Sequence, residues 1–125
     1  RQLFPRLWSA QAAYDAFLNY CDNQRKKMLE KKDGRPEKYA AAYVRVLFNL
    51  CELLERGTFS IRISETPVGE AVLKIKAGHF RPGEVIDMGE HWRAEAVRRL
   101  HTCSQQAHPE TADAFLLRIR KAFLE

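Results

Sequence analysis

Positive side chains crowd one short stretch of the chain, "NQRKKMLEKKDGRPEK" at residues 23–38, where seven Lys or Arg accompany three acidic residues. The seven are Arg25, Lys26, Lys27, Lys31, Lys32, Arg35 and Lys38. The dipole of a helix stabilises cations in its last turns, which accounts for some of them. The dipole does not explain the remaining Lys and Arg. Several of these cations would lie within a Debye length of a phosphate bound nearby. Two interpretations stay open, a solvated helix end and a surface that binds nucleic acid.

A second pattern lies in "KYAAAYVRVLFNLCELLERG", residues 38–57. Lys38, Arg45 and Glu52 recur at seven-residue steps, so a helix would place them on one face. An apolar stripe runs beside them. An Arg in this setting can form an ion pair where two helices meet, or it can direct its guanidinium group at a phosphate. The pattern alone favours neither role.

Residues for catalysis or metal binding are sparse. No serine lies in a G-x-S-x-G motif, no cysteine has an evident His and acid beside it, and there is no Gly-rich phosphate loop. Glu84, Asp87 and His91 would share one helix face as metal ligands, but acids also suit the first turns of a helix. His101, Cys103 and His108 form a looser group. We therefore predict no catalytic and no metal-binding residue in this chain.

Length and composition predict one helical domain that comprises all 125 residues, 1–125, with a net charge of +5. No apolar run is long enough to cross a membrane, so we expect no membrane partner. Cys21, Cys51 and Cys103 are odd in number, widely spaced and set among apolar positions, which favours reduced thiols in the cytoplasm. The chain begins at Arg1 without a Met, and we expect it to be part of a longer protein.

Helical periodicity extends over most of the sequence. Ser9 is a suitable N-cap for a first helix, Pro36 and Gly57 would open and close a second, and Pro82 and Pro109 would open two more. The alternation in residues 58–65 predicts a short extended connector. The expected helices cover residues 9–31, 36–57, 67–77, 82–103 and from 109 onward. The predicted fold class is all-α, a bundle of four to five helices with one extended connector.

These motifs resemble a known family. Lys38, Arg45, Glu52, Leu54 and Gly57 match the spacing K-x(6)-R-x(6)-E-x-L-x-x-G, which resembles a helix of predicted nucleotidyltransferases of the polymerase-β superfamily, a group associated with RNA repair. "NYCDNQ" is similar to the family's G-Y-x-x-x-Q helix, and "LKIKAGHF" is similar to its L-x-x-I-R-x-G segment. The ending "HPETADAFLLRI" is similar to the family's lead into a final helix. Ala42 and Asn19 depart from the family, which usually has His and Gly there.

The resemblance implies a helical accessory domain, the C-terminal part of a longer nucleotidyltransferase, that binds nucleic acid (RNA rather than DNA) or nucleotide beside a catalytic domain. The family's catalytic Gly-Ser turn and its paired aspartates, which bind two Mg²⁺ ions, would lie in that other domain. This chain has no D-x-D motif, so we expect it to be inactive alone and to hold no cofactor itself. The implied ligand-binding residues are Gln24, Arg25, Lys27, Lys38 and Arg45, with Glu52 orienting Arg45.

An alternative is a stand-alone helical interaction module that docks on a partner protein, such as a separate catalytic chain. Leu3, Phe4, Leu7 and Trp8 would then supply an exposed apolar patch ahead of the first helix.

Overall fold

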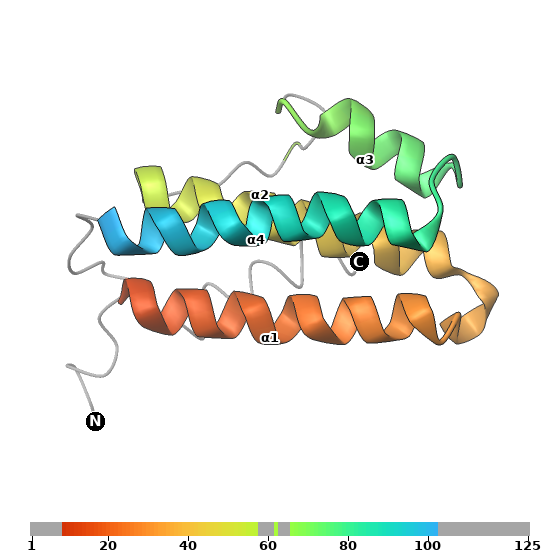
Figure 1. Cartoon of the computed structure of the whole chain (residues 1–125), viewed down its shortest axis with the longest axis horizontal. Coiled ribbons are helices and arrows are strands. Elements are labelled where there is room, and N and C mark those ends of the chain that lie inside the picture. The colour runs from red at the N-terminus through yellow and green to blue at the C-terminus, as the bar shows by residue number, and fades with distance from the viewer. Residues whose placement is uncertain (1–8, 58–61, 63–65, 103–125) are drawn as a thin grey trace.

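The computed structural model describes residues 9–57, 62 and 66–102, which form an all-α bundle (Figure 1). Its elements are α1 (Ala10–Leu29), the short 3₁₀ turn η2 (Lys32–Gly34), α2 (Pro36–Arg56), α3 (Gly69–Lys76) and α4 (Pro82–Thr102). These described residues include no strand, and the predicted all-α fold class is confirmed. The helix expected from Pro109 and all but one residue of the expected connector at 58–65 lie outside the described residues.

The helices begin and end where the sequence provides caps. The Ser9 hydroxyl accepts a hydrogen bond from the Ala12 N–H at 3.0 Å and caps α1. Pro36 occupies the first turn of α2, and Gly57 closes that helix with a φ of 79° that suits glycine. Gly78 follows α3 with a φ of 84° in the same way. These capping and terminating residues lie where the sequence predicts them. Helix α1 ends at Leu29, slightly earlier than the expected residue 31.

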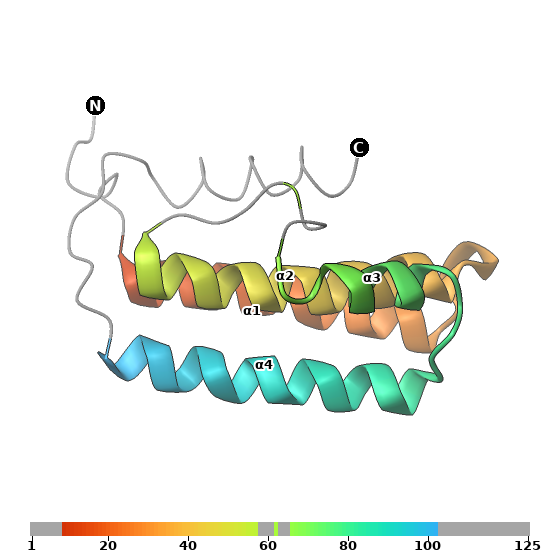
Figure 2. The ribbon, with the colours of Figure 1, turned by 90° about the horizontal axis from the view of Figure 1, so that it is seen from above.

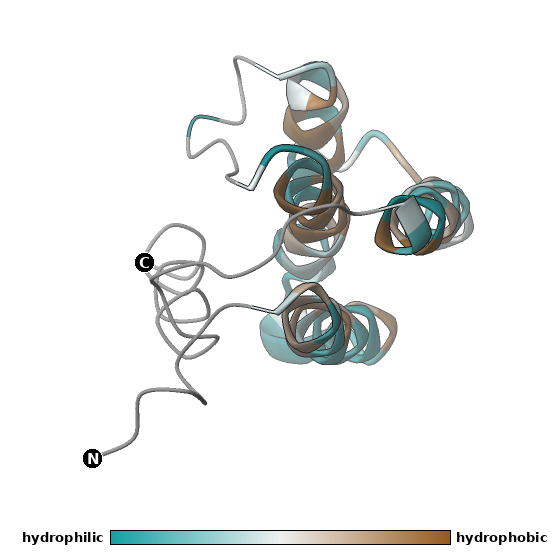
Figure 3. Ribbon diagram, turned by 90° about the vertical axis from the view of Figure 1, so that its left-hand side faces the viewer, coloured by the Kyte–Doolittle hydropathy of each residue, from teal (hydrophilic) through white to brown (hydrophobic). Residues whose placement is uncertain are grey.

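Helix α2 is the centre of the bundle, because α1, α3 and α4 all pack against it (Figures 2 and 3). Viewed along the helix axes, α2 lies between α3 and α1, with α4 to one side (Figure 3). Burial extends almost without a break from Tyr39 to Leu54, so α2 is apolar on most of its circumference. The largest fully buried side chains include Phe17, Met28, Tyr43, Leu47, Leu50 and Leu53.

Close packing brings α4 against α2 at one glycine. A Cβ atom added to Gly89 would lie 2.2 Å from Cε2 of the buried Tyr43 ring, so only glycine fits there without movement. Further along, the Phe48 and Trp92 rings meet edge to face with their centroids 5.1 Å apart. The Cys51 thiol donates to the Trp92 carbonyl at 3.4 Å.

Two ion pairs also join α4 to the neighbouring helices α1 and α2. Arg93 Nη1 lies 3.0 Å from Asp22 Oδ1 on α1, and this hydrogen bond raises the pKa of Arg93. Arg99 Nη1 lies 2.6 Å from Glu55 Oε1 near the end of α2. These pairs fix the position of α4 along both neighbouring helices.

Candidate nucleic-acid interface

Four helix ends converge at one end of the bundle: α1 and α3 finish there, and α2 and α4 begin (right-hand side of Figure 1). We call this region, residues 25–38 with 74–82, the basic end. Its exposed cations come from α1, α2, α3 and the loops before α2 and α4; they are Lys26, Lys31, Lys32, Arg35, Lys38, Lys74, Lys76 and Arg81. These two stretches hold ten Lys or Arg against three acids, Glu30, Asp33 and Glu37. The arrangement leaves the surface of this end strongly positive.

The loop between α1 and α2 is tight and strained. Lys31, Asp33 and Gly34 have φ values of 52°, 59° and 65°, a left-handed conformation that costs a non-glycine residue about 1–2 kcal/mol. Hydrogen bonds stabilise this loop: among them, the Gly34 N–H donates to the Lys31 carbonyl at 2.9 Å, and the Tyr39 hydroxyl donates to Asp33 Oδ2 at 2.8 Å. The loop thereby holds Lys31 and Lys32 exposed at the tip of the bundle.

Tyr39 also draws two predicted ligand-binding lysines together. The ammonium groups of Lys27 on α1 and Lys38 on α2 lie 5.7 Å and 5.4 Å from the centroid of its ring. Cation–π attraction and the shared ring hold two positive charges near one another. The hydrogen bond to Asp33 is the main cause that raises the pKa of the Tyr39 hydroxyl, so the phenol stays neutral beside them. The sequence did not indicate that this pair would form.

The other two predicted residues of α1 lie on different sides of the helix. Gln24 is only 2% exposed, and its Oε1 makes no hydrogen bond within the described part of the chain. Arg25 is half-buried and lines an open hollow of about 480 Å³ between α1 and α4, with Asp22 and Arg93 among its neighbours. The structure therefore does not bring Gln24, Arg25 and Lys27 to one surface.

Arg45 and Glu52 lie further along α2. Arg45 is half-buried, and burial is the main cause that lowers its pKa, while nearby Tyr20 acts in the opposite direction. Glu52 is 5% exposed and accepts hydrogen bonds from Asn49 Nδ2 at 2.8 Å and from Arg56 Nη2 at 2.7 Å. These partners place Glu52 in a polar network within α2. The proposed orientation of Arg45 by Glu52 stays a prediction, as do the ligand-binding roles.

The residues considered as metal ligands have other contacts. Glu84 Oε1 accepts the Arg81 N–H at 2.8 Å and so caps the start of α4. Asp87 and His91 are exposed, and the His91 ring packs edge to face against Trp92. Within the described residues, no group of three or more His, Cys, Asp or Glu side chains could hold a metal ion. Of the looser group, Cys103 and His108 lie outside these residues, as do Leu3, Phe4, Leu7 and Trp8 of the alternative interaction patch.

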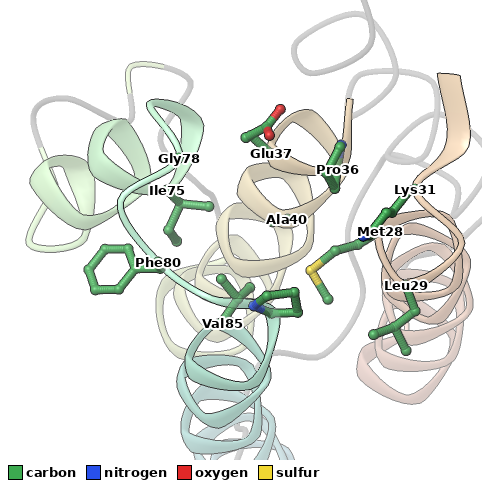
Figure 4. A pocket seen from close by; sticks show the side chains of 11 residues that line it. Met28, Leu29, Lys31, Pro36, Glu37, Ala40, Ile75, Gly78, Phe80 and Val85 are labelled. Carbon is green, nitrogen blue, oxygen red and sulfur yellow. The ribbon is translucent and has the colours of Figure 1, made fainter. Parts of the chain in front are cut away.

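A cavity of about 260 Å³ opens in the middle of the basic end (Figure 4). Apolar side chains from α1, α2, α3, α4 and the segment before α4 surround it, namely Met28, Leu29, Ala40, Ile75, Phe80 and Val85. Lys31 and Glu37 are the charged residues in its described lining. The sequence gives little indication of this cavity, because its walls come from four helices and from loops between them.

Searches against known protein families, curated proteins and solved structures each found no match. The resemblance to polymerase-β-type nucleotidyltransferases therefore stays a prediction. None of the helices in the described ranges combines the length and the apolar character needed to cross a membrane.

Proposed function

We propose that this chain is a helical accessory domain that binds nucleic acid, RNA in preference to DNA, at its basic end. The observation that carries the proposal is the convergence of exposed cations from three helices and a strained loop on one end of the bundle. The resemblance supplies the wider setting: a Mg²⁺-dependent nucleotidyltransferase catalytic domain beside this one, on the same or a separate chain, in the cytoplasm. Nucleotide is the smaller ligand that the same surface would accept.

The helix dipole does not require this convergence. It favours Lys26 and Lys27 in the last turn of α1, each by about 0.3–1 kcal/mol. It offers little to Lys32, which lies beyond the last turn of α1, and it disfavours Arg35 and Lys38 at the start of α2. A phosphate backbone across this end would provide the counter-charge that the fold itself lacks.

Within this proposal the predicted residues have different roles. Lys27 and Lys38, held together over Tyr39, contact one phosphate region, while Arg25 reaches the strand from the α1–α4 side. Arg45 lies about 10 Å along α2 from Lys38, one or two phosphates further on the same face. Gln24 and Glu52, both buried, support the helices that carry these cations.

Fluorescence anisotropy with labelled single-stranded and hairpin RNA and DNA, repeated across salt concentrations, tests the proposal. We expect affinity to fall steeply with salt, and K31Q/K32Q to weaken binding and flatten the salt dependence by about one to two released counterions. The control, R98Q, removes an exposed cation near the end of α4 opposite the basic end, leaves the Arg56–Glu52 bond intact and should change affinity little. Absence of binding at low salt, or an equal loss per charge removed in both variants, would refute a specific interface at the basic end.

A further inference from the structure

We infer that the cavity at the basic end receives one unpaired nucleobase of the bound strand, while the strand's phosphates lie on the surrounding cations. This inference rests on the proposed function and names how the ligand is seated. Its evidence is the coincidence of an apolar cavity and a ring of positive charge in one place.

The size and lining of the cavity suit a flat, apolar-faced ring. A volume of about 260 Å³ equals roughly eight or nine water molecules, too small for a large ligand and ample for a single base. Met28, Ile75 and Val85 project around the same space from three helices, and Phe80 adds an aromatic ring at its side (Figure 4). Bases that leave the stack are commonly held between aromatic and apolar side chains in this way.

The charges at the cavity favour a base attached to a phosphate backbone. Lys31 lines the cavity from the strained loop, and Lys32 and Arg35 follow it in the chain. A strand whose base enters the cavity would place its adjacent phosphates within reach of these side chains. A neutral apolar ligand would make no use of them, and a cationic peptide would be repelled.

Glu37 gives the cavity a preference among bases. It is the carboxylate in the described lining, and it lies on the first turn of α2 opposite Gly78. A carboxylate only accepts hydrogen bonds, so it pairs with the exocyclic amino group of cytosine, adenine or guanine. Uracil and thymine have no such amino group and present carbonyl oxygens beside their single N–H. The base in the cavity is therefore an amino-bearing one.

The first test compares strands on the unmodified, full chain. An oligoadenylate and an abasic phosphodiester strand of equal length carry the same charge, and they differ only in the bases. We expect the oligoadenylate to bind about tenfold more tightly, and oligouridylate to fall between the two. Equal affinity for all three strands would overturn the inference, while phosphate binding by the basic end, and so the proposed function, would still hold. No binding of any strand at low salt would refute the proposed function itself.

A cavity-filling variant provides the second test. Ala40 is buried and lines the cavity, so A40L should occupy the space and reduce the tenfold preference for bases to about onefold while abasic binding persists. The matched control is L73A, because Leu73 is an exposed apolar residue of α3 outside the described cavity lining. A preference that survives in A40L would contradict the inference.

A cross-linking test needs no variant. Strands with one 6-thioguanine, a photoreactive base that keeps its exocyclic amino group, should cross-link to Met28 or Phe80, as located by mass spectrometry of the digested protein. Cross-links confined to residues outside the cavity would place the base elsewhere and refute the inference.

Discussion

Two buried polar residues on neighbouring helices, Gln24 and Glu52, have very different surroundings. Glu52 has partners on both carboxylate oxygens, at 2.8 Å and 2.7 Å, whereas Gln24 has an oxygen with no hydrogen-bond partner among the described residues. A buried carboxylate contributes stability only while its partners remain, since an unpaired buried charge is costly. Glu52 therefore contributes to the stability of α2, and its predicted orientation of Arg45 stays a prediction.

We expect E52Q to lower the free energy of unfolding by about 1–3 kcal/mol, because the neutral amide loses the charge-assisted bond from Arg56 and sets one donor against Asn49 Nδ2. Urea denaturation measures this change. Nucleic-acid affinity of the folded variant should remain within twofold of the parent. The comparison variant R45A should weaken binding by about 1–3 kcal/mol. If E52Q weakened binding as much as R45A does, Glu52 would act by orienting Arg45 after all.

At the scale of the helices, the contact between α2 and α4 depends on Gly89. G89A would place a methyl group 2.2–2.3 Å from three atoms of Tyr43, whose ring is fully buried and cannot turn aside. We expect a loss of about 1–3 kcal/mol or more in unfolding free energy, as in other overpacked cores, and G89A/Y43L should recover part of it.

The control for this prediction is G83A in the same helix. Gly83 has no atom within 4 Å of an added Cβ, so alanine there should be neutral or slightly stabilising. Thermal denaturation of the three variants measures the difference. A G89A protein as stable as G83A would show that α2 and α4 do not approach each other this closely.

The helices themselves could be predicted because residues that cap or terminate helices lie at their ends. Ser9, Pro36, Gly57, Gly78 and Pro82 act on the few residues beside them, so their effect can be recognised without knowledge of the fold.

The candidate site could be predicted only in part. The charge of residues 23–38 is evident from the sequence, but the meeting of Lys27 and Lys38 over Tyr39 depends on how α1 packs against α2. The cavity needs four helices and the loops between them placed together. One signal was present and was overlooked: Phe17, Cys21, Gln24 and Met28 recur at helical spacing, which places Gln24 in the buried stripe of α1.

In the molecule as a whole, the buried core and the exposed cations lie in different places. Helix α2 supplies the centre of the core, and the other described helices cover it. The cations gather at the one end where four helix termini meet. The cations of the basic end lie in the last or first turns of helices and in the loops between them. Binding to these cations therefore does not require the core to change. Variants of the basic end should therefore separate binding from folding more cleanly than variants of α2.

The core also fixes how the whole molecule responds to alkali. Burial raises the pKa of the Cys51 thiol to about 12, and it raises the pKa values of Cys21 and Tyr43 as well. These groups keep their protons in the folded chain at a pH where the unfolded chain has released them. The unfolded state then binds fewer protons than the folded state, so stability decreases as pH rises. The contribution of Cys51 is fully present below about pH 8.5, the ordinary thiol pKa, and is lost toward pH 12.

We expect the unfolding free energy, measured by urea denaturation under reducing conditions, to fall by up to about 1.4 kcal/mol per pH unit for each buried thiol between pH 9 and pH 11. C51A removes one of these thiols and should make the fall shallower, although it lowers stability at neutral pH. L73A changes no titrating group, so it should shift the curve without altering its slope. A C51A curve parallel to that of the parent would mean that the Cys51 thiol titrates alike in both states and is open to water in the folded chain.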